Sequence, residues 1–358
     1  MQTKNNRNYY IDFLKFIFSI MIVFYHSWVF TGIFGAGYFN RGYYAVDFYF
    51  IVTGFLFIKS IEKLTKKKRK ENLGKLDLQF VRNRLKPLLP SMILIYLIGY
   101  ILVYHNSLFD YHILFSDQTI SEFSFLGLIG NGMSINLGCW YISVMLILFF
   151  ILFPIAYKYQ KTYNYYIAPI LIILTLGLIG YHQVNITDPL ARNYIFINGF
   201  YKGIIFINLG VIAYELCNYL KTKKLTKQKK ICITIIESLI YLFLLLNMHY
   251  GIAGSYLIAI LFLLGVAITF SNTSYTANIF HSKIFQQLGK FGFILYLTNI
   301  PVRTFVASSF TYSYHKMLLI YWLITIFLSI IIYVLAEVVW PKAKELKRNK
   351  RKGEKIWN

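Results

Sequence analysis

The chain has 358 residues, of which 57% are hydrophobic and 14% charged, and its formal net charge at pH 7 is +23. An ordinary soluble domain has about 25% charged residues, so this composition excludes that class and indicates a membrane protein. The three cysteines show neither a pairing pattern nor the spacing of metal ligands. We therefore expect no disulfide and no metal site from Cys139, Cys217 and Cys232.

Apolar segments of roughly 20 residues, the length that crosses a bilayer, recur along the whole chain. We therefore predict an all-α, polytopic integral membrane protein with about ten transmembrane helices. The first segment is too long for a signal peptide and lacks a small-residue cleavage site after it, so we expect it in the mature protein. The predicted segments are 11–30, 43–58, 87–105, 140–156, 165–181, 199–217, 231–249, 255–270, 291–310 and 317–339.

The 37 Lys and Arg residues are distributed unevenly over the loops between these segments. If successive loops lie on alternate sides of the membrane, nearly all of these Lys and Arg residues lie on the same side as the N-terminus. Cytoplasmic loops carry an excess of Lys and Arg, so we predict that both termini are cytoplasmic. The loop at 105–137 has no Lys or Arg, and we expect it outside. The exceptions are Arg41, Arg192, Lys202, Arg303 and Lys316.

Two basic runs, KLTKKKRK and PKAKELKRNKRKGEK, contribute much of the net charge. Their position beside predicted spans favours topology signals that contact anionic membrane lipids, with nucleic-acid binding as the alternative. We therefore expect lipid contacts and no nucleic-acid partner. No internal repeat is evident, which counts against transporters built from symmetric halves. We divide the chain into one membrane domain at 1–341 and a basic cytoplasmic tail at 342–358.

The first predicted helix carries a stripe of polar side chains at steps of three, four and seven residues: Asp12, Lys15, Ser19 and His26. At about 3.6 residues per turn they fall on one face of a helix that is otherwise hydrophobic. Ionisable groups inside a membrane span are costly and indicate a functional site by default. We therefore expect this stripe to face protein or substrate.

The second predicted helix places a carboxylate, Asp47, opposite His26 if the two helices are antiparallel neighbours. A carboxylate that accepts one ring N–H leaves the other imidazole nitrogen free as a general base, so we predict a catalytic pair. Gly54 shares the face of Asp47 and would permit close helix packing. The alternative is that His26 is a packing residue hydrogen-bonded to a neighbouring helix.

A basic cluster, Arg82, Arg84 and Lys86, precedes the third predicted helix on the predicted cytoplasmic side. The planar fork of arginine suits phosphate because it can donate two parallel hydrogen bonds, so the cluster is a candidate phosphate site. A solvated loop that only determines topology is an equally simple interpretation.

Aromatic and polar residues near the later helices are candidate substrate contacts. Trp140 begins the fourth predicted helix at the membrane interface, where it would either belong to the aromatic belt or stack on a sugar. Tyr296, Asn299 and Arg303 share a face of the ninth predicted helix. An arginine that deep in a span should face a cavity, so we expect this face to line the site.

Five sequence segments resemble motifs of the acyltransferase 3 family of integral-membrane acyltransferases, and together they span nearly the whole chain. The family has a basic residue, ten intervening residues and a histidine in its first helix, which Lys15 and His26 match. Its second-helix motif resembles AVDFYFIVTGF, which keeps Asp47 and Gly54. Its arginine-rich segment, its tryptophan helix and its late helix resemble FVRNRLKPLLP, CWYISVMLILFFILFP and GKFGFILYLTNIPV.

Four positions depart from the family pattern. Lys15 replaces the usual arginine of the first helix, and Thr53 replaces a serine of the second. Met145 stands where one subgroup has glutamate, and Asn299 stands where many members have histidine.

The resemblance implies a multi-pass acyltransferase of the bacterial plasma (inner) membrane. It implies transfer of an acyl group from a cytoplasmic acyl-CoA to a sugar hydroxyl of a cell-surface or lipid-linked glycan. Acetyl-CoA is the expected donor. Polysaccharide-assembly proteins are expected partners. A glycan flippase or polymerase of polysaccharide export is the alternative function, and a scaffolding membrane protein is a third.

The candidate site residues divide between donor and acceptor. His26 would deprotonate the acceptor hydroxyl or be acylated transiently, and Asp47 would orient it. Lys15 lies roughly 16 Å from His26 on a straight helix, so it is expected to meet the donor. Expected at the acyl-CoA are Lys15, Arg82, Arg84 and Lys86; expected at the acceptor are Trp140, Tyr296, Asn299 and Arg303.

Overall fold

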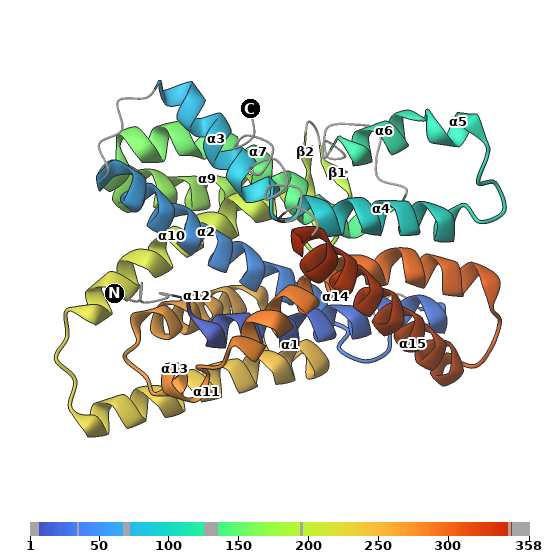
Figure 1. Ribbon diagram of the computed structural model, residues 1–358. Helices are drawn as coiled ribbons and strands as arrows, with labels where there is room; N and C mark the ends of the chain where they lie inside the picture. The colour runs from blue at the N-terminus through green and yellow to red at the C-terminus, as the bar shows by residue number, and fades with distance from the viewer. Residues whose placement is uncertain are drawn as a thin grey trace, which may run out of the picture.

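The computed structural model describes residues 7–33, 36–66, 72–124, 135–193, 196–342 and 345. Apart from one two-residue antiparallel strand pair, its regular elements are helical (Figure 1). In chain order they are α1 (Tyr9–His26), η1 (Ser27–Thr31), η2 (Gly42–Tyr44), α2 (Ala45–Lys66), α3 (Leu73–Leu85), α4 (Leu89–Val103), α5 (Tyr111–Leu114), α6 (Asp117–Phe123), η3 (Leu137–Cys139), α7 (Trp140–Lys158), α8 (Gln160–Thr162), η4 (Tyr163–Ile167), α9 (Ala168–Tyr181), β1 (Arg192–Asn193), β2 (Phe196–Ile197), α10 (Asn198–Lys221), α11 (Lys227–Tyr250), α12 (Ser255–Ser271), α13 (Thr276–Ile279), α14 (Lys283–Ser309), α15 (Tyr314–Tyr333) and η5 (Val334–Val339).

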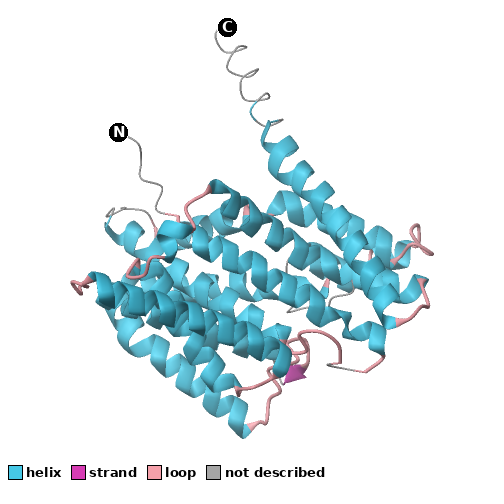
Figure 2. Cartoon of the chain, turned by 90° about the horizontal axis from the view of Figure 1, so that it is seen from below, coloured by secondary structure: helices cyan, strands magenta, loops and turns pink. Residues whose placement is uncertain are grey.

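The long helices confirm the prediction of a polytopic helical membrane protein. In the described part of the chain, eight helical stretches are long and apolar enough to cross a membrane. The pair α3 and α4, bent by 57°, makes a ninth if it forms one span, and α12 is a shorter apolar helix. All ten predicted segments fall on helices of the structure, which run alongside one another in a bundle (Figure 2).

The helices α2 and α10 pack backbone against backbone. A Cβ atom at Gly54 of α2 would collide with the carbonyl oxygen of Ile207, and one at Gly210 of α10 would collide with that of Ile51. Only glycine permits this approach, so the prediction that Gly54 allows close helix packing is confirmed. The two helices are thereby fixed in depth relative to each other.

The helix α1 packs between α2 and α14. Phe16 packs against Phe291 of α14, and the hydroxyl of Tyr321 of α15 donates to the carbonyl of Val23. Hydrogen bonds from a neighbouring side chain to a helix carbonyl are strong orienting contacts where water is excluded. They fix which face of α1 meets α14, and therefore where the polar stripe points.

The two ends of the bundle are closed differently. At the end where α1 begins, Lys290 of α14 forms an ion pair with Glu337 of η5. At the other end, the carboxylate of Glu122 accepts hydrogen bonds from the backbone N–H groups of Ile135 and Asn136. The side-chain amide of Asn136 donates to the carbonyl of Leu297, at 2.8 Å. This ties the described part of the 105–137 loop to α14, while residues 125–134 of that loop lie outside the described residues.

Cysteine labelling tests the predicted topology. Asp117→Cys, in the loop without Lys or Arg, should react with a membrane-impermeant maleimide in intact cells, because its side chain is exposed and on the predicted outer face. Lys224→Cys should react only after the membrane is disrupted. Both variants need Cys232, the exposed native cysteine, replaced by Ala. The reverse labelling pattern would invert the predicted topology.

Candidate active site

Two cavities lie one behind the other along the same four helices, α1, α2, α7 and α14. The His26 cavity has a volume of about 240 Å³ and also receives side chains from α10 and from the loop before β1. The Lys15 cavity has a volume of about 280 Å³ and lies at the end of the bundle where α1 begins. The polar stripe predicted on α1 therefore serves both cavities, with its two ends in different ones.

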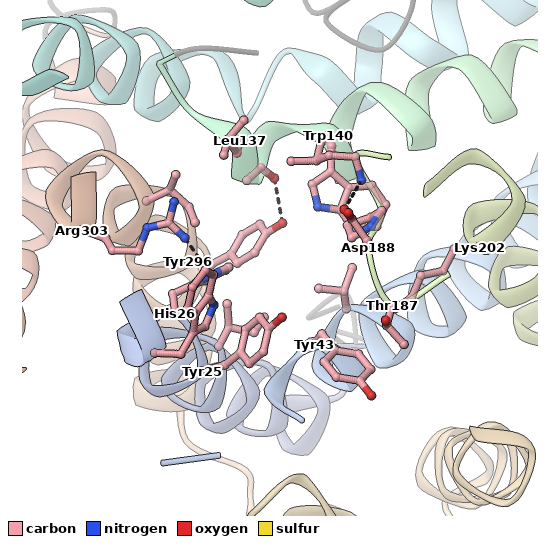
Figure 3. A pocket seen from close by; sticks show the side chains of 17 residues that line it. Tyr25, His26, Tyr43, Leu137, Trp140, Thr187, Asp188, Lys202, Tyr296 and Arg303 are labelled. Atoms are coloured by element: carbon pink, nitrogen blue, oxygen red, sulfur yellow. Dashed lines mark hydrogen bonds between the residues drawn. The ribbon is translucent and has the colours of Figure 1, made fainter. Parts of the chain in front are cut away.

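His26 ends α1 and faces α14. Its Nδ1 lies 3.5 Å from a guanidinium nitrogen of Arg303, which also lines the cavity. A guanidinium can only donate hydrogen bonds, so Nδ1 accepts and the ring hydrogen of a neutral imidazole lies on Nε2. Figure 3 shows His26 and Arg303 on one wall of the cavity, with Trp140, Asp188 and Lys202 on the opposite wall.

Asp47 forms a buried ion pair with Lys202 of α10, not with His26. Lys202 Nζ lies 2.8 Å from Oδ1 of Asp47, and each side chain is 3% exposed. The predicted hydrogen bond between His26 and Asp47 is therefore wrong. Its physical cause is the close packing of α2 on α10, which turns the carboxylate towards Lys202, while His26 turns towards Arg303 of α14.

Lys202 is a residue of this cavity that sequence reasoning missed. The charge distribution over the loops treats it as a loop residue, although it is the fourth residue of the apolar segment at 199–217. A lysine inside a span needs a partner, and that position was the available signal. Its ammonium also lies 5.4 Å from the ring centroid of Tyr43, within cation–π range.

The other predicted contacts of the acceptor side separate into two groups. Trp140, Tyr296 and Arg303 line the His26 cavity. Asn299 does not: it is fully buried, and its side-chain oxygen accepts a hydrogen bond from Tyr321 of α15. The prediction that Asn299 lines the site is therefore wrong. Ile300, four residues after Tyr296, occupies that row of α14 instead, as the i, i+4, i+7 geometry of a helix requires.

A layer of three tyrosines separates the two cavities. The ring of Tyr49 lies between those of Tyr141 and Tyr296, with both centroid distances at 6.1 Å. Tyr49 and Tyr141 line the Lys15 cavity, and Tyr296 lines the His26 cavity. We call these three residues the tyrosine layer. Its rings stand where the two cavities approach each other.

Each hydroxyl of the tyrosine layer is hydrogen-bonded. Tyr49 bonds to Ser19 at 2.6 Å and Tyr141 to Thr53 at 2.6 Å. Tyr296 donates to the carbonyl of Gly138, at 2.7 Å. Ser19 of the polar stripe therefore holds Tyr49 in this layer. Thr53 of α2, a departure from the family motif, holds Tyr141.

Lys15 lines its cavity together with Asp12, whose carboxylate pairs with Arg7 at 2.5 Å. Within the described residues, Lys15 forms no ion pair with a carboxylate. Met145, another of the four departures from the family pattern, also lines this cavity. The cavity thus combines apolar side chains with charged groups of both signs, since Lys290 and Glu337 also line it.

The basic cluster predicted before the third span does not act as one unit. The guanidinium of Arg84 donates to the Ser60 hydroxyl at 2.5 Å and to the Leu56 carbonyl at 3.4 Å, so α2 holds it. Arg82 and Lys86 line a separate cavity of about 290 Å³ together with Trp340. The prediction that all three side chains gather around one phosphate site is therefore wrong.

Comparison with known proteins adds one match. The family model described as an acyltransferase domain matches residues 8–338, nearly the whole chain. No curated protein and no solved structure matches the chain.

Removing the partner of Asp47 should destabilise the bundle. Lys202→Met leaves a buried carboxylate unpaired, which typically costs about 3–5 kcal/mol of unfolding free energy. The double variant Lys202→Met with Asp47→Leu should recover most of that loss, because a buried ion pair and an apolar pair of similar volume are close in energy. Unfolding of the purified protein in detergent measures both. Equal stability of the wild type and the single variant would contradict the assignment of the ion pair.

Proposed function

This chain belongs to the family of membrane acyltransferases that its sequence resembles, and from that premise we propose which group it transfers and to what. The proposed reaction moves an acyl group from cytoplasmic acyl-CoA to a sugar hydroxyl of a cell-surface or lipid-linked glycan. Acetyl is the expected acyl group. The observation that carries this proposal is the pair of cavities on four shared helices, with His26 in one and Lys15 in the other. The bacterial inner membrane and partnership with polysaccharide-assembly proteins belong to the same proposal.

The His26 cavity is the proposed acceptor side. Nδ1 of His26 carries the ring lone pair in the tautomer that Arg303 selects. Once a substrate oxygen draws the guanidinium away, Nδ1 can take the proton of the acceptor hydroxyl. The hydroxyl oxygen then bonds to the carbonyl carbon, the C–S bond breaks, and the proton passes to the leaving thiolate. Arg303 is placed to stabilise the negative charge that develops on the carbonyl oxygen.

Transient acylation of His26 is the second route to the same product. The imidazole nitrogen would bond to the acyl carbon as the C–S bond breaks and the thiolate leaves. The acceptor hydroxyl oxygen would then bond to the acyl carbon, the C–N bond would break, and the hydroxyl proton would pass to the thiolate. In both routes Trp140 and Tyr296 supply an aromatic wall on which a sugar ring can pack. Lys202 and Asp47 have a structural role, because their ion pair holds the wall of the cavity that faces His26.

The Lys15 cavity is the proposed donor side. It lies at the end of the bundle that the charge distribution assigns to the cytoplasm, where acyl-CoA is available. Its narrow, largely apolar space suits the arm of CoA that carries the thioester, with Lys15 near the polar end of that arm. The tyrosine layer then stands between the thioester and His26, so its rings must shift for the acyl group to pass.

The same layer argues against a glycan flippase. Such a protein needs a path wide enough for sugar units, whereas these two cavities are small and interrupted by Tyr49, Tyr141 and Tyr296. Passage of a two-carbon acyl group requires much less movement than passage of a sugar.

Replacement of His26 should abolish transfer without preventing insertion. His26→Ala should lower the rate of acyl transfer by about 10² to 10⁴, the usual loss for a positioned general base, or by more if His26 is acylated. The assay is incorporation of labelled acetyl from acetyl-CoA into membrane glycan. His105→Ala is the matched control, because His105 is exposed at the same end of the bundle. Near-normal transfer by His26→Ala, at equal membrane abundance, would remove His26 from the mechanism.

A further inference from the structure

A fourth cavity, of about 590 Å³, is larger than each of the three already described. Four cationic side chains line it: Arg7 before α1, Lys59 of α2, Lys221 of α10 and Lys230 of α11. We call it the basic cavity. It lies at the end of the bundle where α1 begins, the end assigned to the cytoplasm.

The cationic side chains of the basic cavity outnumber the carboxylates near them, because Glu62, which interacts with Lys59 and Lys221, already forms an ion pair with Lys66. Arg7 pairs with Asp12, but within the described residues none of the three lysines forms an ion pair with a carboxylate. Cations that converge on one space repel one another, and an anion bound between them relieves that repulsion. A topology signal requires lysines on one side of the membrane, but it does not require them to surround a cavity.

The remaining lining suits an anion with a polar organic body. Asn272, Asn278 and Ser274 contribute amide and hydroxyl groups, and Tyr275 and His281 contribute rings. Amides and hydroxyls can bond to a sugar or a heterocyclic base, and rings can stack on a base. An inorganic ion would use little of this surface.

The basic cavity adjoins the Lys15 cavity, since Arg7 lines both. A ligand with a phosphorylated head and a long neutral arm could therefore place its head among the lysines and its arm beside Lys15. We propose that the basic cavity binds the phosphorylated nucleotide end of the acyl-CoA donor. This inference rests on the proposed function, which makes acyl-CoA the donor.

The cavity of Arg82 and Lys86 is the competing location for the nucleotide. It has two cationic side chains and about half the volume, and Arg84 is held by α2. The phosphate of an anionic lipid shares the chemistry of a nucleotide phosphate and is the other possible source of the anion. The tests below distinguish the proposed site from the Arg82 and Lys86 cavity, and CoA from an anionic lipid.

Binding of CoA to the purified full-length protein in nanodiscs of neutral phosphatidylcholine is the direct test. Lys59→Ala with Lys221→Ala should raise the Kd for CoA about tenfold or more, because charge-assisted hydrogen bonds to phosphate are lost. Lys224→Ala, which removes a nearby exposed charge outside the cavity, should leave the Kd unchanged. Thermal unfolding of each variant checks its fold, and Lys59→Gln provides a milder change if the double variant is unstable.

A donor without a nucleotide separates binding from chemistry. The double variant should transfer acetyl from acetyl-pantetheine at the wild-type rate, while its KM for acetyl-CoA rises and its kcat is retained. Equal CoA affinity in the wild type and the double variant would overturn this inference alone. The inference would also be overturned if the Arg82→Ala variant lost affinity for CoA while the Lys221→Ala variant bound CoA as tightly as the wild type. Loss of binding to phosphatidylglycerol, with CoA binding intact, would instead assign the cavity to lipid. Failure of the wild type to bind CoA would overturn the proposed function as well.

Discussion

The ion pair between Asp47 and Lys202 is the constraint on which the site depends. Two charges are expensive to bury in a membrane bundle, and they are tolerated here because each has the other at 2.8 Å. About two helical turns away, Gly54 and Gly210 let the backbones of α2 and α10 touch, which sets the depth at which the charges meet. The ion pair joins α2 to α10, so Asp47 does not contact His26, and His26 contacts Arg303 of α14 instead.

That commitment produces two cavities with different chemistry on the same four helices. Near His26 the polar side chains that line the cavity include Arg303, Tyr296, Asp188 and Lys202, the last of which is paired with Asp47. Near Lys15 the walls are more apolar, and two ion pairs, Arg7 with Asp12 and Lys290 with Glu337, contribute the other charged side chains. The tyrosine layer between them is held by hydrogen bonds to α1, α2 and η3, so the separation is a property of the packing. In the proposed reaction, this arrangement keeps donor and acceptor apart except for the acyl group.

Much of the fold follows from sequence, because hydrophobic length and polar periodicity are local properties. All ten predicted segments are helical, and Lys15 and His26 line cavities, as expected for ionisable groups in a span. The partners of these groups do not follow, because they depend on which helices are neighbours. Asp47 could have met His26 on α1, yet α10 is closer. Asn299 differs from Ile300 by one position, a rotation of about 100°, which turns it from the cavity to Tyr321.

The central claim is that the acyl group crosses the tyrosine layer from a cytoplasmic donor to an acceptor on the other side. Sealed membrane vesicles of defined orientation test it, because CoA esters do not cross bilayers. Inside-out vesicles given external labelled acetyl-CoA should label glycan enclosed in their lumen, whereas right-side-out vesicles given the same donor should label none. Labelling by right-side-out vesicles would place donor and acceptor on one side and contradict the account.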